Sequence, residues 1–346
     1  MKINFQKDFL LYNKREKFLS GVFFMKKNIA FVYDSQSVYG IEDLLGYSDF
    51  CYDDEAQYFK KSLESLGGYN VTIFCGVKNF FDAYNGGKNF DMVFNKCEGF
   101  GSRNREGLFP ALLEFYNIPF VGTDAYGLSL SLNKFHTKLI ADYYKIPSPK
   151  FELINEFEDV NKITSLEYPV IVKPSSEGSS MGVVIVEAPE KLKQVVNDVS
   201  EKYGYSLICE EYIYGNEVSV PIIGTGDKAK ALGPIEFRQN DGKFFPIYST
   251  EAKYYSGCQT LFFEGSERAK EVMTDSALKI YKALGCRDFG RADYRVRGDE
   301  AFLLEMNPLP TLSEHGSFEL WADSNNSSFA KLLEEIIKSA EERYKK

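Results

Sequence analysis

The feature that most constrains the fold is a regular alternation of apolar runs and amphipathic segments that begins near residue 29. The runs at 29–33, 71–75, 91–95 and 118–121 are rich in Val, Ile and Phe, which predicts strands. Between the first two runs, apolar residues recur at helical spacing and a Gly-Gly pair follows them. Strands that alternate with helices predict a mostly parallel sheet with helices on both faces.

The pattern changes after residue 127 and predicts two further lobes of α+β type. We expect one long helix over about 128–144, a small unit of strands and helices up to about residue 213, and helices near 270–284 and 329–343 in the remainder. Residues 1–24 precede a second methionine and are either a real arm or the product of an upstream start codon. The expected extension and three lobes are residues 1–24, 25–127, 128–215 and 216–346.

Composition argues against several classes of function. The chain of 346 residues has a net charge of −9, whereas a nucleic-acid-binding surface needs clustered Lys and Arg. No apolar run approaches the roughly 18 residues that span a membrane, and the first 24 residues lack the apolar core of a signal peptide. Because the six cysteines are widely spaced and only two histidines are present, no zinc cluster is predicted, and we expect a reduced, cytoplasmic protein.

The last lobe contains two strand-like segments with charged residues two positions apart. Arg291 and Asp293 share one face of their strand, and Glu305 and Asn307 share one face of the next, because side chains alternate along a strand. A hairpin with the right register places all four in one patch. Oxygen ligands from Asp, Glu and Asn suit magnesium, and an adjacent arginine suits a phosphoryl group. The alternative is a surface hairpin with an ordinary ion pair.

A glycine- and serine-rich loop follows a strand that ends at Lys173. The segment 178–182 offers backbone N–H groups and two hydroxyls with little bulk, as phosphate binding requires. It is not a Walker A loop, because no Gly-Lys-Ser/Thr follows it. A second lysine, Lys134, stands near the start of the helix between lobes. Taken alone, the loop is weak evidence for phosphate binding, because most glycine- and serine-rich loops are simply mobile turns.

Taken in order, these motifs resemble the D-alanine–D-alanine ligase family of the ATP-grasp superfamily. The resemblance runs from about residue 93 to the C-terminus. It implies an α/β and α+β, three-lobed ATP-grasp fold with an N-terminal parallel α/β domain. The matching segments are residues 133–134, 168–182, 209–217, 251–254, 285–293 and 304–307.

The resemblance also implies a role for each residue of the motifs, in a reaction that uses ATP and magnesium. The residues implied to contact ATP are Lys134, Lys173, Ser179, Ser180, Glu210, Glu211, Ile213, Glu217 and Lys253. Those implied to bind two Mg²⁺ ions, for which Mn²⁺ is a substitute, are Asp293, Glu305 and Asn307. Those implied to act in catalysis are Arg291, Ser180 and Tyr254.

The substrate side departs from the family pattern. The Gly-Gly-x-Ser-x-Glu segment of the first lobe is missing, and the family's Asn-Thr-x-Pro-Gly becomes Asn307-Pro-Leu-Pro-Thr311. Charged residues also follow the third strand of the first lobe, at the sheet edge where ligands bind in open α/β sheets, and the candidates for substrate selection are Glu98, Arg103, Arg105 and Glu106. A solvated charged loop explains this run about as well. Ser317 is a further candidate, because it stands near the position of the family's His-Ser pair.

Three functions follow from these observations. The first is an ATP-dependent carboxylate–amine ligase that joins amino acids or small peptides through an acyl phosphate, releasing ADP and phosphate. The second is the housekeeping D-alanine–D-alanine ligase of peptidoglycan synthesis, and the third is a non-catalytic ATP-binding module. The resemblance further implies a homodimer, and the charge and the apolar runs argue against a nucleic-acid or membrane partner.

Overall fold

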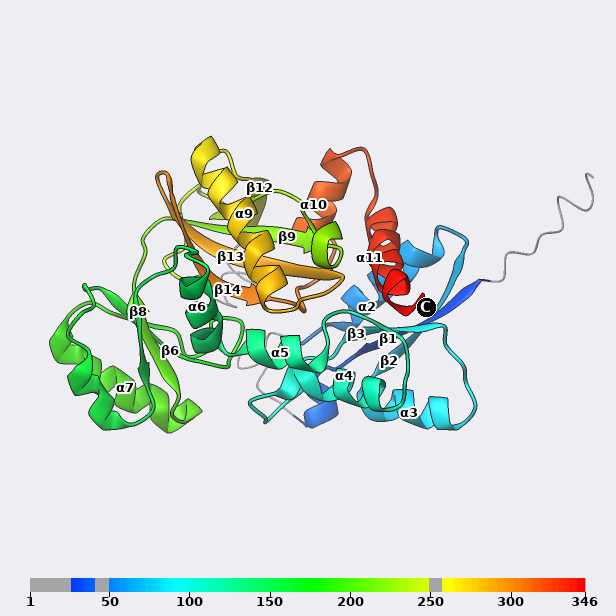
Figure 1. Ribbon diagram of the computed structural model, residues 1–346, viewed down its shortest axis with the longest axis horizontal. Coiled ribbons are helices and arrows are strands. Elements are labelled where there is room, and N and C mark those ends of the chain that lie inside the picture. The colour runs from blue at the N-terminus through cyan, green and yellow to red at the C-terminus, as the bar shows by residue number, and fades with distance from the viewer. Residues whose placement is uncertain (1–25, 41–49, 249–256, 346) are drawn as a thin grey trace, which may run out of the picture.

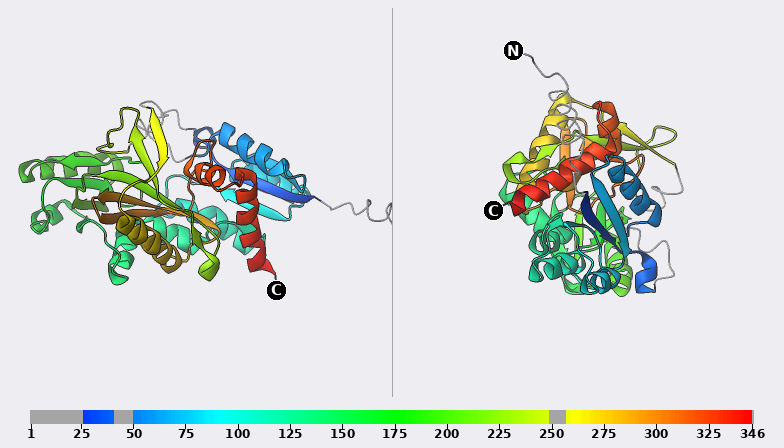
Figure 2. Two further views of the ribbon diagram at one scale, coloured as in Figure 1. Left: turned by 90° about the horizontal axis from the view of Figure 1, so that it is seen from above. Right: turned by 90° about the vertical axis from the view of Figure 1, so that its right-hand side faces the viewer.

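Three separate sheets form the framework of the molecule in the computed structural model, which describes residues 26–40, 50–248 and 257–345 (Figures 1 and 2). The first sheet is parallel throughout, in the order β2-β1-β3-β4, which confirms the predicted parallel α/β lobe. Its strands are β1 (Lys27–Tyr33), β2 (Tyr69–Cys75), β3 (Met92–Lys96) and β4 (Phe120–Val121).

Alternate side chains of β1 pack on opposite faces of this sheet. Ile29 and Phe31 pack in one apolar cluster with α2 (Asp53–Glu64) and the C-terminal helix α11 (Phe329–Tyr344). Ala30 and Val32 belong to a second cluster, with α3 (Val77–Asn85) and α4 (Arg105–Phe115). The last helix of the chain therefore covers the first sheet, as Figure 1 shows.

The central lobe is an antiparallel sheet covered by one helix. The strand order is β5-β8-β6-β7, and α7 (Pro189–Tyr203) packs on one face through Leu192, Val196 and Val199. The glycine- and serine-rich loop connects β6 to β7, as predicted. The strands are β5 (Phe151–Ile154), β6 (Val170–Pro174), β7 (Val184–Val186) and β8 (Leu207–Glu211).

The third sheet has six strands among the described residues, with β12-β11-β9-β13-β14 in order and β10 paired to β9. Helix α9 (Glu267–Ala283) covers its apolar face and lies in front of the strands in Figure 1. A short helix, α10 (Ser317–Ser324), follows the sheet. The strands are β9 (Asn216–Ile223), β10 (Lys230–Ala231), β11 (Ile235–Gln239), β12 (Cys258–Phe262), β13 (Phe289–Arg297) and β14 (Glu300–Asn307).

The single helix predicted over 128–144 is wrong. Two helices, α5 (Ala125–Leu132) and α6 (Lys134–Tyr143), meet at Asn133, whose backbone leaves the helical region at φ −83° and ψ 103°. The Asn133 side chain accepts a hydrogen bond from the backbone N–H of His136 at 3.0 Å, which caps α6. The break makes Lys134 the first residue of a new helix.

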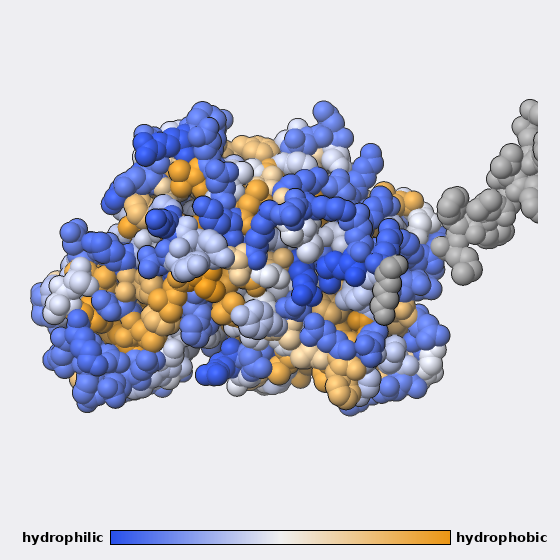
Figure 3. Space-filling view, in the orientation of Figure 1, coloured by the Kyte–Doolittle hydropathy of each residue, from blue (hydrophilic) through white to orange (hydrophobic). Residues whose placement is uncertain are grey.

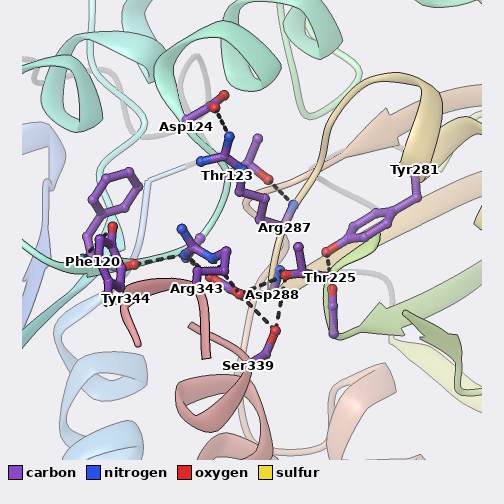
Figure 4. A network of polar contacts seen from close by, with 12 residues as sticks. Phe120, Thr123, Asp124, Thr225, Tyr281, Arg287, Asp288, Ser339, Arg343 and Tyr344 are labelled. Carbon is purple, nitrogen blue, oxygen red and sulfur yellow. Dashed lines mark hydrogen bonds and ion pairs between the residues drawn. The ribbon is translucent and has the colours of Figure 1, made fainter. Parts of the chain in front are cut away.

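A buried carboxylate, Asp288, joins the first lobe to the third sheet and to α11 (Figure 4). It accepts hydrogen bonds from the backbone N–H of Gly122 and from the hydroxyls of Thr225 and Ser339, each at 2.9 Å. The guanidinium of Arg343 donates to the same carboxylate. Because these partners come from three parts of the chain, the network fixes how the lobes meet.

The face of the molecule shown in Figure 3 is mostly hydrophilic, with apolar patches over the central lobe and over the first lobe near α3 and α4. Within the described residues, no helix is both long and apolar enough to cross a membrane. The predicted lobe boundaries and the role of residues 1–24 stay predictions, and residues 1–24 lie outside the described part of the chain.

Candidate active site

The predicted four-residue patch forms on the β13–β14 hairpin. Arg291 pairs with Asn307 and Asp293 pairs with Glu305 across the two antiparallel strands. The Arg291 guanidinium donates two hydrogen bonds of 2.7 Å to the Asp293 carboxylate. The register shifts just beyond this point, which inserts Leu304 as an extra residue. A bulge of this kind re-aims neighbouring side chains and often lies beside a site.

Glu305 is held by a lysine from another lobe. The ammonium of Lys134 lies 3.0 Å from the Glu305 carboxylate and also donates to the backbone carbonyl of Glu177. Burial alone raises the pKa of Glu305, but Lys134 and Lys173 outweigh it and lower the pKa to about 2. The carboxylate is therefore ionised throughout the neutral range, as a cation ligand must be.

Lys173 takes part in a buried charge cluster that sequence reasoning described only in part. The Glu210 carboxylate, 1% exposed, lies between the ammonium groups of Lys173 and Lys138. Lys138 is fully buried and 2.8 Å from Glu210. Burial raises the pKa of Glu210, but the two lysines outweigh it and lower that pKa below its usual value. The cluster fixes Lys173 at the base of the loop.

Lys138 was missed because a lysine inside a predicted helix is usually exposed. One signal was present: Lys138 follows Lys134 by four residues, so both lie on the same face of a helix. Only the contact between α6 and β8, where Lys138 meets Glu210, shows that this face is buried.

The loop between β6 and β7 has an unusual backbone. Ser179 and Ser180 have φ values of 47° and 61°, in a region that residues other than glycine rarely adopt. A Cβ on Gly182 would lie 2.8 Å from the ring of Tyr203, so glycine is required there. The Ser180 hydroxyl donates to the backbone carbonyl of Tyr248 at 3.0 Å. The loop thus closes as a lid onto the third lobe.

Two cavities lie under and beside the lid. The lid cavity lies between the central and third lobes, and the hairpin cavity, of about 370 Å³, lies over the β13–β14 patch. The predicted residues that line the lid cavity include Lys134, Lys173, Ser180, Glu210, Glu211, Ile213, Glu217, Asp293 and Glu305. Those that line the hairpin cavity include Glu98, Lys134, Ser179, Ser180, Glu217, Arg291, Asp293, Glu305, Asn307 and Ser317.

The comparisons with known proteins agree with this geometry. The family model described as "D-ala D-ala ligase C-terminus" matches residues 139–338. The D-alanine–D-alanine ligase of Thermotoga petrophila is 33% identical over 285 residues, which cover 81% of this chain and 89% of that protein. The chain belongs to the D-alanine–D-alanine ligase family. As a member, it is an ATP-grasp carbon–nitrogen ligase, which confirms the family and the reaction class expected from the motifs.

Solved structures of the family share the fold of this chain. The D-alanine–D-alanine ligase of Bacillus anthracis, crystallised with ATP, superimposes with a TM-score of 0.70 at 22% identity and covers 91% of this chain and 97% of its own. The VanG D-Ala:D-Ser ligase of Enterococcus faecalis gives a TM-score of 0.68 at 19% identity and covers 91% and 100%. These likenesses confirm the predicted three-lobed ATP-grasp fold.

The expected site residues of this ligase-family member also include Lys253 and Tyr254, which lie outside the described residues. Arg103 lines a separate cavity, beside the hairpin cavity. The carboxylate of Glu217 lies 2.8 Å from the guanidinium of Arg295, a buried residue that sequence reasoning did not select. Arg295 also donates to three backbone carbonyls, so it anchors the wall that carries Glu217.

Proposed function

We propose that this ligase activates a carboxylate of an amino acid or small peptide with ATP and transfers the resulting acyl group to an amine. The observation that carries the proposal is the convergence of Lys134, Lys173 and Arg291 on the space between the lid and the β13–β14 hairpin. Fixed cations under a lid suit the charge that develops on a transferring phosphoryl group.

The proposed role of each residue follows from its position around the two cavities. Lys134 and Lys173 would hold the phosphates of ATP, with Ser179 and Ser180 of the lid above them. The lid cavity would take the nucleoside, with Ile213 as an apolar wall. Glu210 would act mainly by fixing Lys173, because its carboxylate is enclosed by two lysines.

The chemistry of the donor set fits magnesium. Asp293, Glu305 and Asn307 present two carboxylates and one amide oxygen on one face of the hairpin. When bound, the ions neutralise negative charge on the phosphates of ATP. The protein's own contribution is to hold these oxygens on a rigid hairpin and to place Arg291 beside them.

The reaction needs no protein nucleophile. A carboxylate oxygen of the substrate attacks the γ-phosphorus of ATP, which gives an acyl phosphate and ADP. The amine nitrogen then attacks the acyl carbon, forms the amide and releases phosphate. The roles of the protein are to position both substrates, to exclude water beneath the lid and to stabilise charge.

The housekeeping reaction, which joins two D-alanines, is the second candidate because the Thermotoga petrophila relative carries that name. A residue expected near the substrate favours the broader ligase reaction over the housekeeping reaction. Thr311 stands where the family pattern has glycine, and it lines the hairpin cavity. A family-typical homodimer in the cytoplasm completes the proposal, and sedimentation of the purified protein tests the dimer.

The direct test is ADP release by the full chain with Mg²⁺ and a panel of D- and L-amino acids and dipeptides, singly and in pairs. We expect at least one carboxylate–amine pair to stimulate ADP release and to give an amide of matching mass. Absence of stimulation by every member would favour the third candidate, a non-catalytic ATP-binding module.

A further inference from the structure

A third cavity, of about 490 Å³, lies beside the hairpin cavity, and the proposed function above gives it no ligand. We call it the loop cavity, because the loop 98–104 of the first lobe forms one wall. The base of the lid and the C-terminal end of α7 form the others. Its volume is within the range of ordinary small-molecule sites. Its charged and hydroxyl-bearing lining residues include Glu98, Arg103, Arg105, Ser176, Tyr203 and Tyr205.

The wall of the loop cavity is rigidly built. The fully buried carboxylate of Asp34, at the end of β1, accepts hydrogen bonds from the backbone N–H groups of Glu98 and Gly99 at 2.9 and 2.8 Å. Gly99 has a φ of +67°, and a Cβ there would lie 2.4 Å from the carbonyl oxygen of Arg105. The loop is therefore folded tightly back onto the start of α4.

Two arginines face the cavity in different ways. Arg105 is 9% exposed and donates to the backbone carbonyl of Ser176 at 2.7 Å, which ties the loop to the base of the lid. Arg103 is exposed and lines the cavity, and no carboxylate of the described residues forms an ion pair with its guanidinium. Arg105 is thus structural, whereas Arg103 is available to a ligand.

The loop cavity adjoins the two cavities of the site and shares lining residues with each. Glu98 lines both the loop cavity and the hairpin cavity, and Glu177 and Met181 line both the loop cavity and the lid cavity. A substrate whose reacting carboxylate lies near Arg291 can therefore extend past Glu98 into the loop cavity. Glu98 is 6% exposed and suits an ammonium group at that point.

We propose that the acyl donor of this ligase carries a second, distal anion that Arg103 binds in the loop cavity. This inference rests on the proposed function and narrows its substrate class to amino acids or short peptides with an anionic far end. A guanidinium suits both a carboxylate and a phosphate, because it donates paired hydrogen bonds to either. The ammonium of the donor would lie beside Glu98.

The test uses hydroxylamine in place of the unknown amine. The donor carboxylate attacks the γ-phosphorus of ATP and gives an acyl phosphate and ADP; the nitrogen of hydroxylamine then attacks the acyl carbon and gives a hydroxamate and phosphate. Hydroxamate formation by the full chain is compared for D- and L-forms of alanine, glutamine, glutamate and O-phosphoserine. Glutamine is the neutral match for glutamate, and O-phosphoserine separates phosphate from carboxylate recognition.

We expect kcat/KM for an anionic donor to exceed that for glutamine and alanine by at least tenfold. In Arg103→Gln the ratio of anionic to neutral donors falls at least tenfold, and Arg103→Lys recovers part of it. Arg297→Gln is the matched control, because Arg297 is an exposed arginine on the distant β13–β14 turn, and the ratio stays unchanged.

Two outcomes overturn the inference but not the proposed ligase function. The first is that the wild type uses neutral donors as well as anionic ones, and the second is that Arg103→Gln leaves the ratio of anionic to neutral donors unchanged. Failure of every donor to form a hydroxamate contradicts the proposed function itself, and the inference falls with it. Thermal unfolding with ATP and Mg²⁺ confirms that the variants are folded and bind nucleotide.

Discussion

Asp293 and Glu305 lie directly opposite each other on β13 and β14, yet each pairs with a different cationic side chain. Arg291 forms an ion pair with Asp293, and Lys134 forms one with Glu305. Two carboxylates at adjacent positions repel each other unless cations separate them. The two cationic side chains come from different lobes, since Arg291 is on the hairpin and Lys134 begins α6. The pair is thus assembled only where the lobes meet.

The first prediction concerns these two carboxylates. Asp293→Ala and Glu305→Ala are each expected to lower carboxylate-dependent ADP release by at least about 100-fold, because each removes an oxygen ligand for the ions that neutralise phosphate. Asp299→Ala, in the exposed turn of the same hairpin, is the control and leaves the rate unchanged. Retained turnover in either site variant would contradict the metal assignment.

The second prediction concerns the buried lysine. Lys138→Met leaves Glu210 with one cation instead of two and is expected to cost about 3 kcal/mol of unfolding free energy, the scale of a broken buried ion pair. KM for ATP should rise, because Glu210 then positions Lys173 less firmly. Urea unfolding and ADP-release kinetics measure the two effects.

An exposed lysine on α7 provides the control for this change. Lys193→Met should leave both the urea midpoint and KM near the wild-type values. In the double variant Lys138→Met/Glu210→Gln, the stability should partly recover while KM for ATP stays high. A normal KM in Lys138→Met would show that Lys138 does not act through Glu210.

The third prediction is a pH dependence of stability. Lys134 and Lys173 outweigh the effect of burial and hold the pKa of Glu305 at about 2, below its ordinary value of 4.5. The stabilisation is complete above about pH 4.5 and is lost as the pH falls toward 2, because the unfolded chain binds the proton first. The urea midpoint of Glu305→Gln should therefore fall less steeply between pH 5 and pH 3 than that of the wild type. Parallel slopes would contradict the pairing.

The fourth prediction concerns the junction around Asp288. Arg343→Met leaves a buried carboxylate without its cation, and we expect a loss of about 3–5 kcal/mol. Ser339→Ala removes one hydrogen bond and should cost about 1 kcal/mol. Arg268→Met, at an exposed position of α9, is the control. Equal urea midpoints for Arg343→Met and Arg268→Met would show that the network does not hold the lobes together.

The hairpin patch was predictable from the sequence because strand alternation alone decides which side chains share a face. Arg291 and Asp293 needed only a partner strand in the right register, and the turn at 297–300 supplied it. The bulge at Leu304 was not predictable, because strand alternation does not show where the register of a hairpin shifts. Because the bulge lies between Glu305 and the turn of the hairpin, the Arg291–Asn307 and Asp293–Glu305 pairs keep the predicted register.

Other parts of the site depend on tertiary contacts that no local pattern encodes. Asn133 breaks the predicted long helix because its backbone leaves the helical region and its side chain caps α6, which packs against β14 and α9 of the third lobe. Arg103 and Arg105 look alike in the sequence, but only Arg105 reaches the base of the lid. Their different environments become visible only when the loop is folded back at Gly99.

The central claim is that this ligase activates its carboxylate as an acyl phosphate, and isotope transfer tests it most directly. The best donor from the panel is labelled with ¹⁸O in both carboxylate oxygens and turned over with ATP, Mg²⁺ and its amine. The claim predicts one ¹⁸O atom in each phosphate released, because the bridging oxygen stays with phosphorus when the amine attacks carbon. Unlabelled phosphate, formed while amide is made, would contradict it.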